Sequence, residues 1–165
     1  MNTLSHALAA RLTVLALSLM TPLAAQAHEG YDKALQAYSC VDYEKALSLF
    51  KTYAKEGHGL SQYMMGIMTE QGQGTAADVQ AAFDYYMTAA KQGIPDAYFA
   101  LADMYAKGSA VAKDPVQAYA WFELAKQGGH KLAGDMLASL SQQLNPDQIA
   151  QARKMGQEWL AKLTP

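Results

Sequence analysis

Residues 93–129 of this chain read GIPDAYFALADMYAKGSAVAKDPVQAYAWFELAKQGG, and a similar pattern, GHGLSQYMMGIMTEQGQGTAADVQAAFDYYMTAAKQG, occupies residues 57–93, one 36-residue step earlier. Glycine, acidic, alanine and aromatic positions recur in register, and the matching sets are Gly57, Gly93 and Gly129; Asp42, Asp78 and Asp114; Ala46, Ala82 and Ala118; and Phe50, Tyr86 and Phe122. A period of this length is typical of stacked helical hairpins. Such arrays bury a core between neighbouring repeats and leave one long surface accessible to other molecules.

Each period predicts two helices separated by a turn. The first helix begins at Pro95 and stops before Gly108, because proline suits a first helical position and glycine suits a helix end. The second begins at Asp114, whose side chain can cap the first turn ahead of Pro115, and ends near Gln127. The same signals one and two periods earlier predict further helices of this kind.

Both ends of the array depart from the period. The segment 145–148, Asn-Pro-Asp-Gln, predicts a capped start for a long final helix whose apolar face is formed by Ile149, Ala152, Met155, Gly156, Trp159 and Leu163. A helix over residues 31–38 is predicted to pair with the one that begins at Asp42, through a connection about five residues shorter than in later repeats. We therefore predict one all-α domain, 28–165, an α/α superhelical solenoid of about three repeats near 42–57 (partial), 58–93 and 94–129, with a C-terminal capping segment, 130–165.

Residues 1–27 have the features of a secretory signal peptide. Arg11 is the only charged residue there, an apolar run follows from Leu12 to Met20, and Ala25-Gln26-Ala27 has the form of a cleavage site. The apolar run is too short for a membrane span, which needs roughly 20 residues, and charges interrupt every later stretch. We expect cleavage near Ala27, a periplasmic or secreted mature protein, and no integral membrane span.

Charge and cysteine content narrow the possible partners. The chain carries 13 Lys and Arg against 15 Asp and Glu, a net charge of −2, so we expect no nucleic-acid partner. Cys40 is the only cysteine, which rules out an internal disulfide. An intermolecular disulfide stays open, but a small buried thiol is the favoured interpretation. Because Cys40 lies well beyond Ala27, a lipid anchor is not expected.

The repeat resembles the Sel-one-like repeat, a relative of the tetratricopeptide repeat. The pattern of that repeat is A-x-x-x-L-G-x-x-Y-x-x-G, followed by a loop with Asp and then by A-x-x-W-Y-x-x-A-A-x-x-G. The residues of this chain that match the pattern are Ala97, Leu101, Ala102, Tyr105, Gly108, Asp114, Ala118, Trp121, Phe122, Ala125 and Gly129. The earlier repeat departs from it at Ser61 and Thr69. The resemblance, which extends to small exported bacterial members of the family, implies a right-handed superhelix that acts as an adaptor or scaffold. A branch linked with β-lactam binding and hydrolysis carries cysteine pairs, which are missing here.

Helical geometry predicts a partner-binding surface. Residues two positions before and after Leu101 lie about 200° around the helix axis from it, so Phe99 and Asp103 are expected to face away from the hairpin core. In tetratricopeptide relatives these positions line the concave groove. The equivalent positions in the repeats before and after, together with nearby acidic residues, complete the predicted surface, which suits a peptide with basic and apolar residues. The predicted residues are Tyr63, Ile67, Glu70, Asp96, Phe99, Asp103 and Asp135. The alternative is that these residues pack against a neighbouring repeat.

No catalytic, metal or cofactor site is predicted. Ser61 and Ser139 are expected to lack an adjacent histidine with an orienting acid. His58 and His130 are two repeats apart, too distant to share a metal, and are interpreted as turn residues. The favoured function is a non-enzymatic protein or peptide adaptor in the bacterial cell envelope. Two alternatives are an envelope hydrolase acting on peptidoglycan or β-lactams, and a structural protein that associates weakly with itself.

Overall fold

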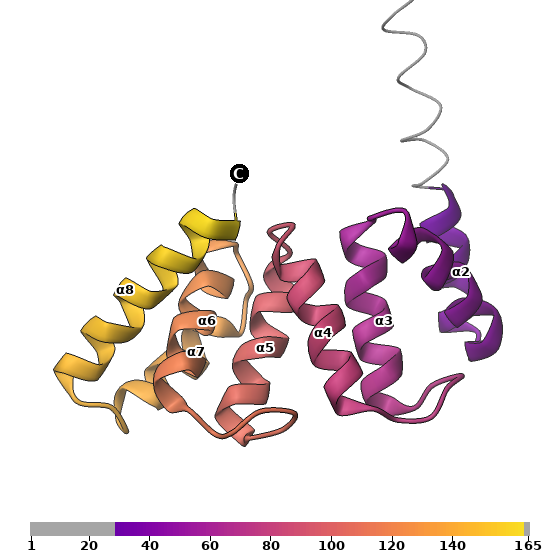
Figure 1. The fold of residues 1–165 in the computed structure, drawn as a ribbon. Coiled ribbons are helices and arrows are strands. Elements are labelled where there is room, and N and C mark those ends of the chain that lie inside the picture. Colours follow the sequence, from indigo (N-terminus) through magenta and orange to yellow (C-terminus); the bar gives the residue numbers. More distant parts are fainter. Residues whose placement is uncertain (1–28, 164–165) are drawn as a thin grey trace, which may run out of the picture.

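The computed structural model describes residues 29–163, over which the chain folds into helices packed side by side, with no strand in that range. After a first helix at residues 29–39, the helices are α2 (Tyr43–Lys55), α3 (Gly59–Gln71), α4 (Val79–Ala90), α5 (Pro95–Lys107), α6 (Pro115–Gln127), α7 (Ala133–Ser141) and α8 (Pro146–Leu163). Figure 1 shows them in a curved row that runs from α2 to α8. The predicted all-α solenoid is confirmed, whereas the predicted signal peptide lies outside the described residues.

The helix starts are capped as the sequence predicts. The Asp78 carboxylate accepts hydrogen bonds from two backbone amides of the first turn of α4, both at 3.0 Å, and Asp114 does the same for α6 at 2.9 and 3.0 Å. At the start of α8, Asn145 and Gln148 each accept the other's backbone N–H at 2.9 Å, a reciprocal capping box. Polar side chains therefore mark where α4, α6 and α8 begin.

The core lies between the helices of each hairpin and between successive hairpins. One buried cluster, near the amino end, joins the first helix, α2 and α3 through Ala34, Ala37, Ala46, Phe50, Met64, Met65 and Met68. The larger cluster extends from α4 to α8 and includes the rings of Tyr86, Trp121 and Phe122. Tyr63 and Ile67 pack against both clusters, so α3 links the two halves of the core.

The turn between the first helix and α2 corrects one prediction. Cys40 is exposed there and is not the buried thiol that the sequence favoured. It is the first residue of a turn in which Val41 has a φ of 63° and the N–H of Asp42 returns to the carbonyl of Ala37 at 3.0 Å. This closing bond makes Val41 the left-handed residue of a helix-ending motif, a position that glycine normally occupies. The reversal points the neighbouring side chains outwards.

We expect Val41→Gly to stabilise the fold by about 1 kcal/mol. A left-handed backbone costs an L-residue about 1–2 kcal/mol, and Val41 is 65% exposed, so little packing is lost. Part of the gain is offset by the greater freedom of glycine in the unfolded chain. Urea unfolding followed by circular dichroism measures the change. Val79→Gly is the matched control, because Val79 is also exposed but lies in α4. That variant should lose stability, and equal losses for both would contradict a strained Val41.

Candidate protein-interaction surface

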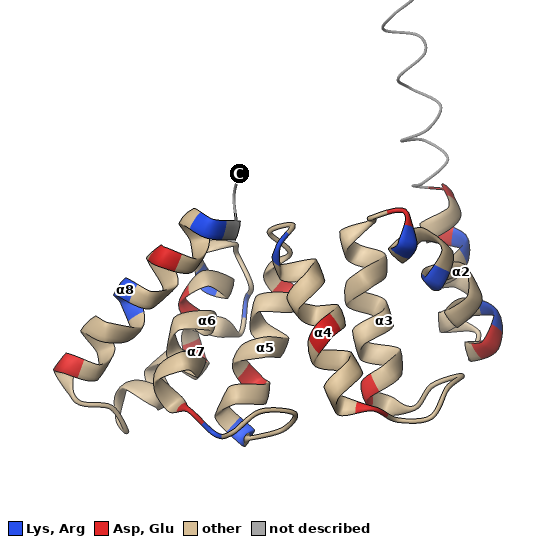
Figure 2. Cartoon of the chain, in the orientation of Figure 1, with Lys and Arg blue, Asp and Glu red and all other residues tan. Residues whose placement is uncertain are grey.

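The central helices carry few charges, and most of these are acidic. Glu70 is the only charged residue of α3 and Asp84 the only one of α4, while α5 carries Asp96, Asp103 and Lys107. Figure 2 shows both signs along the whole row, with acidic residues prevailing over α3, α4 and α5. The middle of the row therefore favours cationic groups over anionic ones. Within residues 29–163, none of the helices has both the length and the apolar character that crossing a membrane requires.

The predicted apolar residues are half-buried and contact neighbouring rings. The ring centroid of Tyr63 lies 5.8 Å from that of Tyr86. Phe99 meets the edge of Phe122 at 5.1 Å and stacks on the ring of His130 at 4.0 Å. These contacts hold the side chains in place and leave part of each at the surface. Tyr63 and Phe99 thus pack in part against neighbouring helices, as the alternative interpretation expected. Their role in binding stays a prediction.

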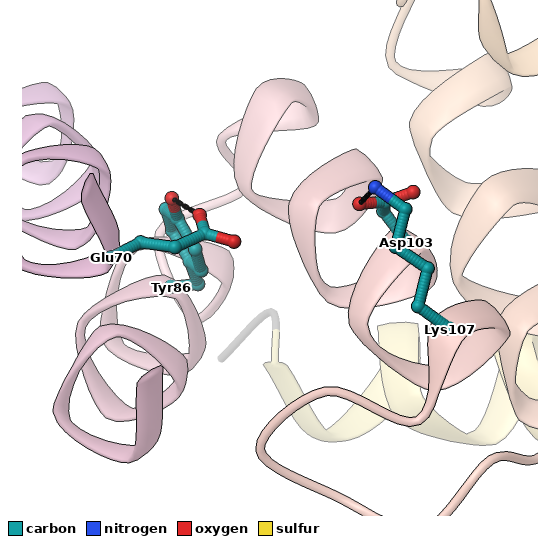
Figure 3. Close-up of polar contacts among 4 residues, drawn as sticks. All are labelled: Glu70, Tyr86, Asp103 and Lys107. Atoms are coloured by element: carbon teal, nitrogen blue, oxygen red, sulfur yellow. Dashed lines mark hydrogen bonds and ion pairs between the residues drawn. The ribbon is translucent and has the colours of Figure 1, made fainter. Parts of the chain in front are cut away.

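Each of the predicted acidic groups on α3 and α5 is held by a partner. The Tyr86 hydroxyl donates to Glu70 at 2.7 Å, and Lys107 pairs with Asp103 at 2.6 Å. Figure 3 shows these two pairs on neighbouring helices, with the carboxylate of Glu70 pointing towards the helix that carries Asp103. At the start of α5, a carboxylate oxygen of Asp96 lies 3.5 Å from Nε2 of His130. These contacts fix the positions of carboxylates that come from two successive repeats.

Burial and nearby charges raise the pKa values of two tyrosines in this region, Tyr63 and Tyr86. Burial raises the pKa of Tyr63 to about 12, with further contributions from the charge of Asp96, from Tyr31 and from Glu70. Burial also raises the pKa of Tyr86, and its hydrogen bond to Glu70 adds to the effect. Both tyrosines therefore remain protonated at neutral pH. Tyr31, Tyr63 and Asp96 come from the first helix, α3 and α5, which are the leading helices of three successive hairpins.

Contacts join Tyr63 to Glu70 through Tyr86, and Phe99 to Asp96 through His130, and the structure adds one ring that the sequence missed. Asp135 is exposed on α7 and makes no hydrogen bond or ion pair with any described residue. Tyr31 is the addition: its ring lies 5.0 Å from His58, much as Phe99 lies against His130. A step of 36 residues back from Tyr63 reaches residue 27, not residue 31. The sequence could have indicated Tyr31 only if the shorter connection between the first two helices had been subtracted from that step. We name as the aromatic-acidic surface Tyr31, Tyr63, Ile67, Glu70, Asp96, Phe99 and Asp103.

A hollow adjoins this surface at the start of α5. Its volume is about 480 Å³, and it is lined by Pro95, Asp96, Gly128, Gly129, His130, Lys131 and Leu132. Leu132 is 58% exposed, so part of its apolar side chain is accessible at the rim of the hollow. His130 links the hollow to the surface, because one face of its ring contacts Phe99 and its Nε2 faces Asp96. An apolar side chain of a partner could therefore contact Leu132 beside the acidic groups.

The sequence predicted no histidine with an orienting acid beside Ser61, and the structure places His58 next to it. Nδ1 of His58 lies 2.8 Å from Oγ of Ser61 and also accepts the backbone N–H of Ser61 at 3.2 Å. The pair resembles a nucleophile and base, but Ser61 is fully buried, so no substrate can reach its hydroxyl. The contact instead caps α3, and His58 is a turn residue as predicted. Among residues 29–163, no cluster of three His, Cys, Asp or Glu residues is placed to hold a metal ion.

Comparison with known proteins gives a consistent picture. The family model of the Sel1 repeat matches residues 41–58, 59–94 and 95–130, more than half of the chain. A solved structure of a protective antigen present in uropathogenic Escherichia coli strains, displaying an SLR fold, is similar with 27% identity and a TM-score of 0.78 over 84% of this chain and 31% of that chain. A Sel1 repeat protein from Oxalobacter formigenes shares the fold at 24% identity and a TM-score of 0.65, over 78% of this chain and 53% of that chain.

The chain spans about a third of the length of the first of these structures and about half of the second. A search among curated proteins found no match.

Proposed function

Because this chain belongs to the Sel1 repeat family, whose repeats generally mediate protein–protein interaction, we propose that it is a non-enzymatic adaptor or scaffold. The partner binds as an extended segment along the aromatic-acidic surface. The observation that carries this proposal is the pairing of aromatic rings with carboxylates on α3 and α5. Tyr86 contacts both Tyr63 and Glu70, and His130 contacts both Phe99 and Asp96. Rings fixed by their neighbours offer contact area at a low entropic cost, which is typical of binding hot spots.

The chemistry of the surface favours a partner segment with basic and apolar residues. Asp96 is exposed at the start of α5, and the side chain of Asp103 retains 31% of its exposure while paired with Lys107. An incoming lysine or arginine can pair with Asp96 and compete with Lys107 for Asp103. Apolar residues between the basic ones would contact the exposed parts of Tyr63, Ile67 and Phe99.

The place of action that we propose is the bacterial cell envelope or the extracellular space, after removal of residues 1–27. The support comes from the leader alone: Arg11 followed by an apolar run, and an Ala-x-Ala site that ends at Ala27. The acidic centre of the row agrees with a partner that carries positive charge.

The test is affinity capture from an envelope fraction with residues 28–165 as bait, followed by measurement of the affinity for the captured partner. Asp96→Asn combined with Asp103→Asn should weaken that affinity about tenfold or more, because both side chains keep their shape while two attractive charges are lost. Circular dichroism should show unchanged helicity. Rising salt should weaken the wild-type complex more than the complex of the double variant.

Asp84→Asn is the matched control, since Asp84 is an exposed carboxylate on α4 that is not part of the aromatic-acidic surface. It should bind the partner as the wild type does. Equal affinity for the wild type and the double variant would place the binding site elsewhere. If no partner is captured and sedimentation shows concentration-dependent oligomers, self-association replaces the adaptor function.

A further inference from the structure

A separate apolar pocket lies where the capping helix meets the repeat core. Its volume is about 300 Å³, at the lower end of the range for small-molecule sites. Four helices contribute to its wall, which is formed by Met87 of α4, Tyr105 of α5, Gln117 and Trp121 of α6, and Trp159 and Lys162 of α8. None of these residues belongs to the aromatic-acidic surface.

Two stacked indoles form a fixed wall of this pocket. The rings of Trp121 and Trp159 lie 4.5 Å apart with an interplanar angle of 27°, and Tyr98 stacks on Trp121 at 5.7 Å. Trp121 is only 4% exposed, whereas Trp159 is half-buried. Because Trp121 contacts both neighbouring rings, it is held in one position before any ligand arrives. A flat apolar group can therefore bind without rearranging the core.

The polar groups of the pocket favour an anion. Lys162 is the only charged lining residue, and it forms no ion pair with any carboxylate of the described chain. The indole N–H of Trp121 is buried and has no hydrogen-bond partner among the described residues, although buried donors are normally paired. Burial and the charge of Asp114 raise the pKa of Tyr105, so its hydroxyl stays a neutral donor.

Asp114, whose charge acts on Tyr105, is already hydrogen-bonded. Asp114 accepts the backbone N–H groups of Val116 and Gln117, and its second oxygen accepts the side-chain amide of Gln117 at 3.0 Å. Gln117 thus separates Asp114 from the pocket, and no Asp or Glu is among the lining residues. The only charge in the lining is therefore the cation of Lys162, next to apolar rings.

We propose that this pocket binds a small carboxylate with an apolar body, such as an arylalkanoic acid or the carboxyl-terminal aromatic residue of a peptide. The ring of the ligand packs against Trp159 and Met87, and its carboxylate pairs with Lys162. Charge complementarity selects the acid over a neutral compound of the same shape. This second site acts independently of the partner-binding surface, and it stands or falls separately from the proposed function.

The two tryptophans of the chain provide a direct readout, because both line this pocket and there are no others. Titration of residues 28–165 with N-acetyl-L-phenylalanine should give a saturable change in tryptophan fluorescence. N-acetyl-L-phenylalaninamide, which has the same ring and no charge, should bind at least tenfold more weakly. 3-Phenylpropionate and a short peptide ending in phenylalanine, run in parallel, distinguish a free acid from a peptide end as the natural source.

Lys162→Met keeps an unbranched stem and removes the charge, so it should abolish the preference for the acid over the amide. Lys154→Met is the matched control on α8, away from the pocket, and should keep that preference. The proposal is overturned if millimolar concentrations of the acids cause no saturable change. It is also overturned if acid and amide bind equally well to the wild type, or if Lys162→Met retains the discrimination.

Discussion

Trp121→Ala is expected to lower the free energy of unfolding by about 3–5 kcal/mol, the usual cost of removing a large ring from a core. Trp121 is 4% exposed and lies between Tyr98 and Trp159, so its truncation leaves a cavity that both neighbours border. The surrounding alanines, Ala118 and Ala125, have no side-chain length with which to fill that space. Urea unfolding followed by circular dichroism at a helix wavelength measures the loss without relying on tryptophan fluorescence.

Trp159→Ala is the control for Trp121→Ala, because it removes the other ring of the same stacked pair. Trp159 is half-buried on the capping helix, so its loss should cost clearly less. A cost below about 1 kcal/mol for Trp121→Ala would mean that this ring is not part of the repeat core.

Gly66→Ala is expected to destabilise the fold by about 2 kcal/mol, within the range for an overpacked core. A Cβ built at Gly66 would lie 2.4 Å from the ring of Tyr86. That ring is 2% exposed and its hydroxyl is bound to Glu70 at 2.7 Å, so it cannot move aside without breaking contacts. The gain from replacing a helical glycine by alanine, about 1 kcal/mol, is smaller than the cost of the clash.

Gly134→Ala serves as the control, since an added Cβ there meets nothing within 4 Å and the residue also lies in a helix, α7. It should stabilise the protein slightly, by about 0.5–1 kcal/mol. The pair of variants separates helix propensity from packing, and their stabilities should change in opposite directions in thermal or urea unfolding. If both stabilise, α3 and α4 are not packed as closely as the Gly66 contact requires.

The sequence by itself determined the helices, their starts and their repetition. Asp78 and Asp114 cap α4 and α6 because a carboxylate reaches only the amides of the next turn, which is a local interaction. The recurrence of alanine, glycine and aromatic positions determined which helix faces are buried, since a period of 36 residues repeats the same packing unit. The fold class followed from this pattern.

Only the tertiary structure decided what the surfaces contain. The sequence predicted Phe99 on an outward face, yet the structure places the ring of His130 over it, from a turn that follows the next helix. The structure likewise places the ring of Tyr31 against His58 and turns Cys40 outwards.

The pocket formed by Met87, Tyr105, Trp121 and Trp159 shows why such features escape a sequence pattern. Its residues come from four helices, and α8 lies outside the repeat. Contacts of this kind depend on the turn between successive hairpins and on the angle at which α8 crosses α6. The turn between hairpins and the crossing angle of α8 result from many side-chain contacts together, and no short stretch of sequence encodes them.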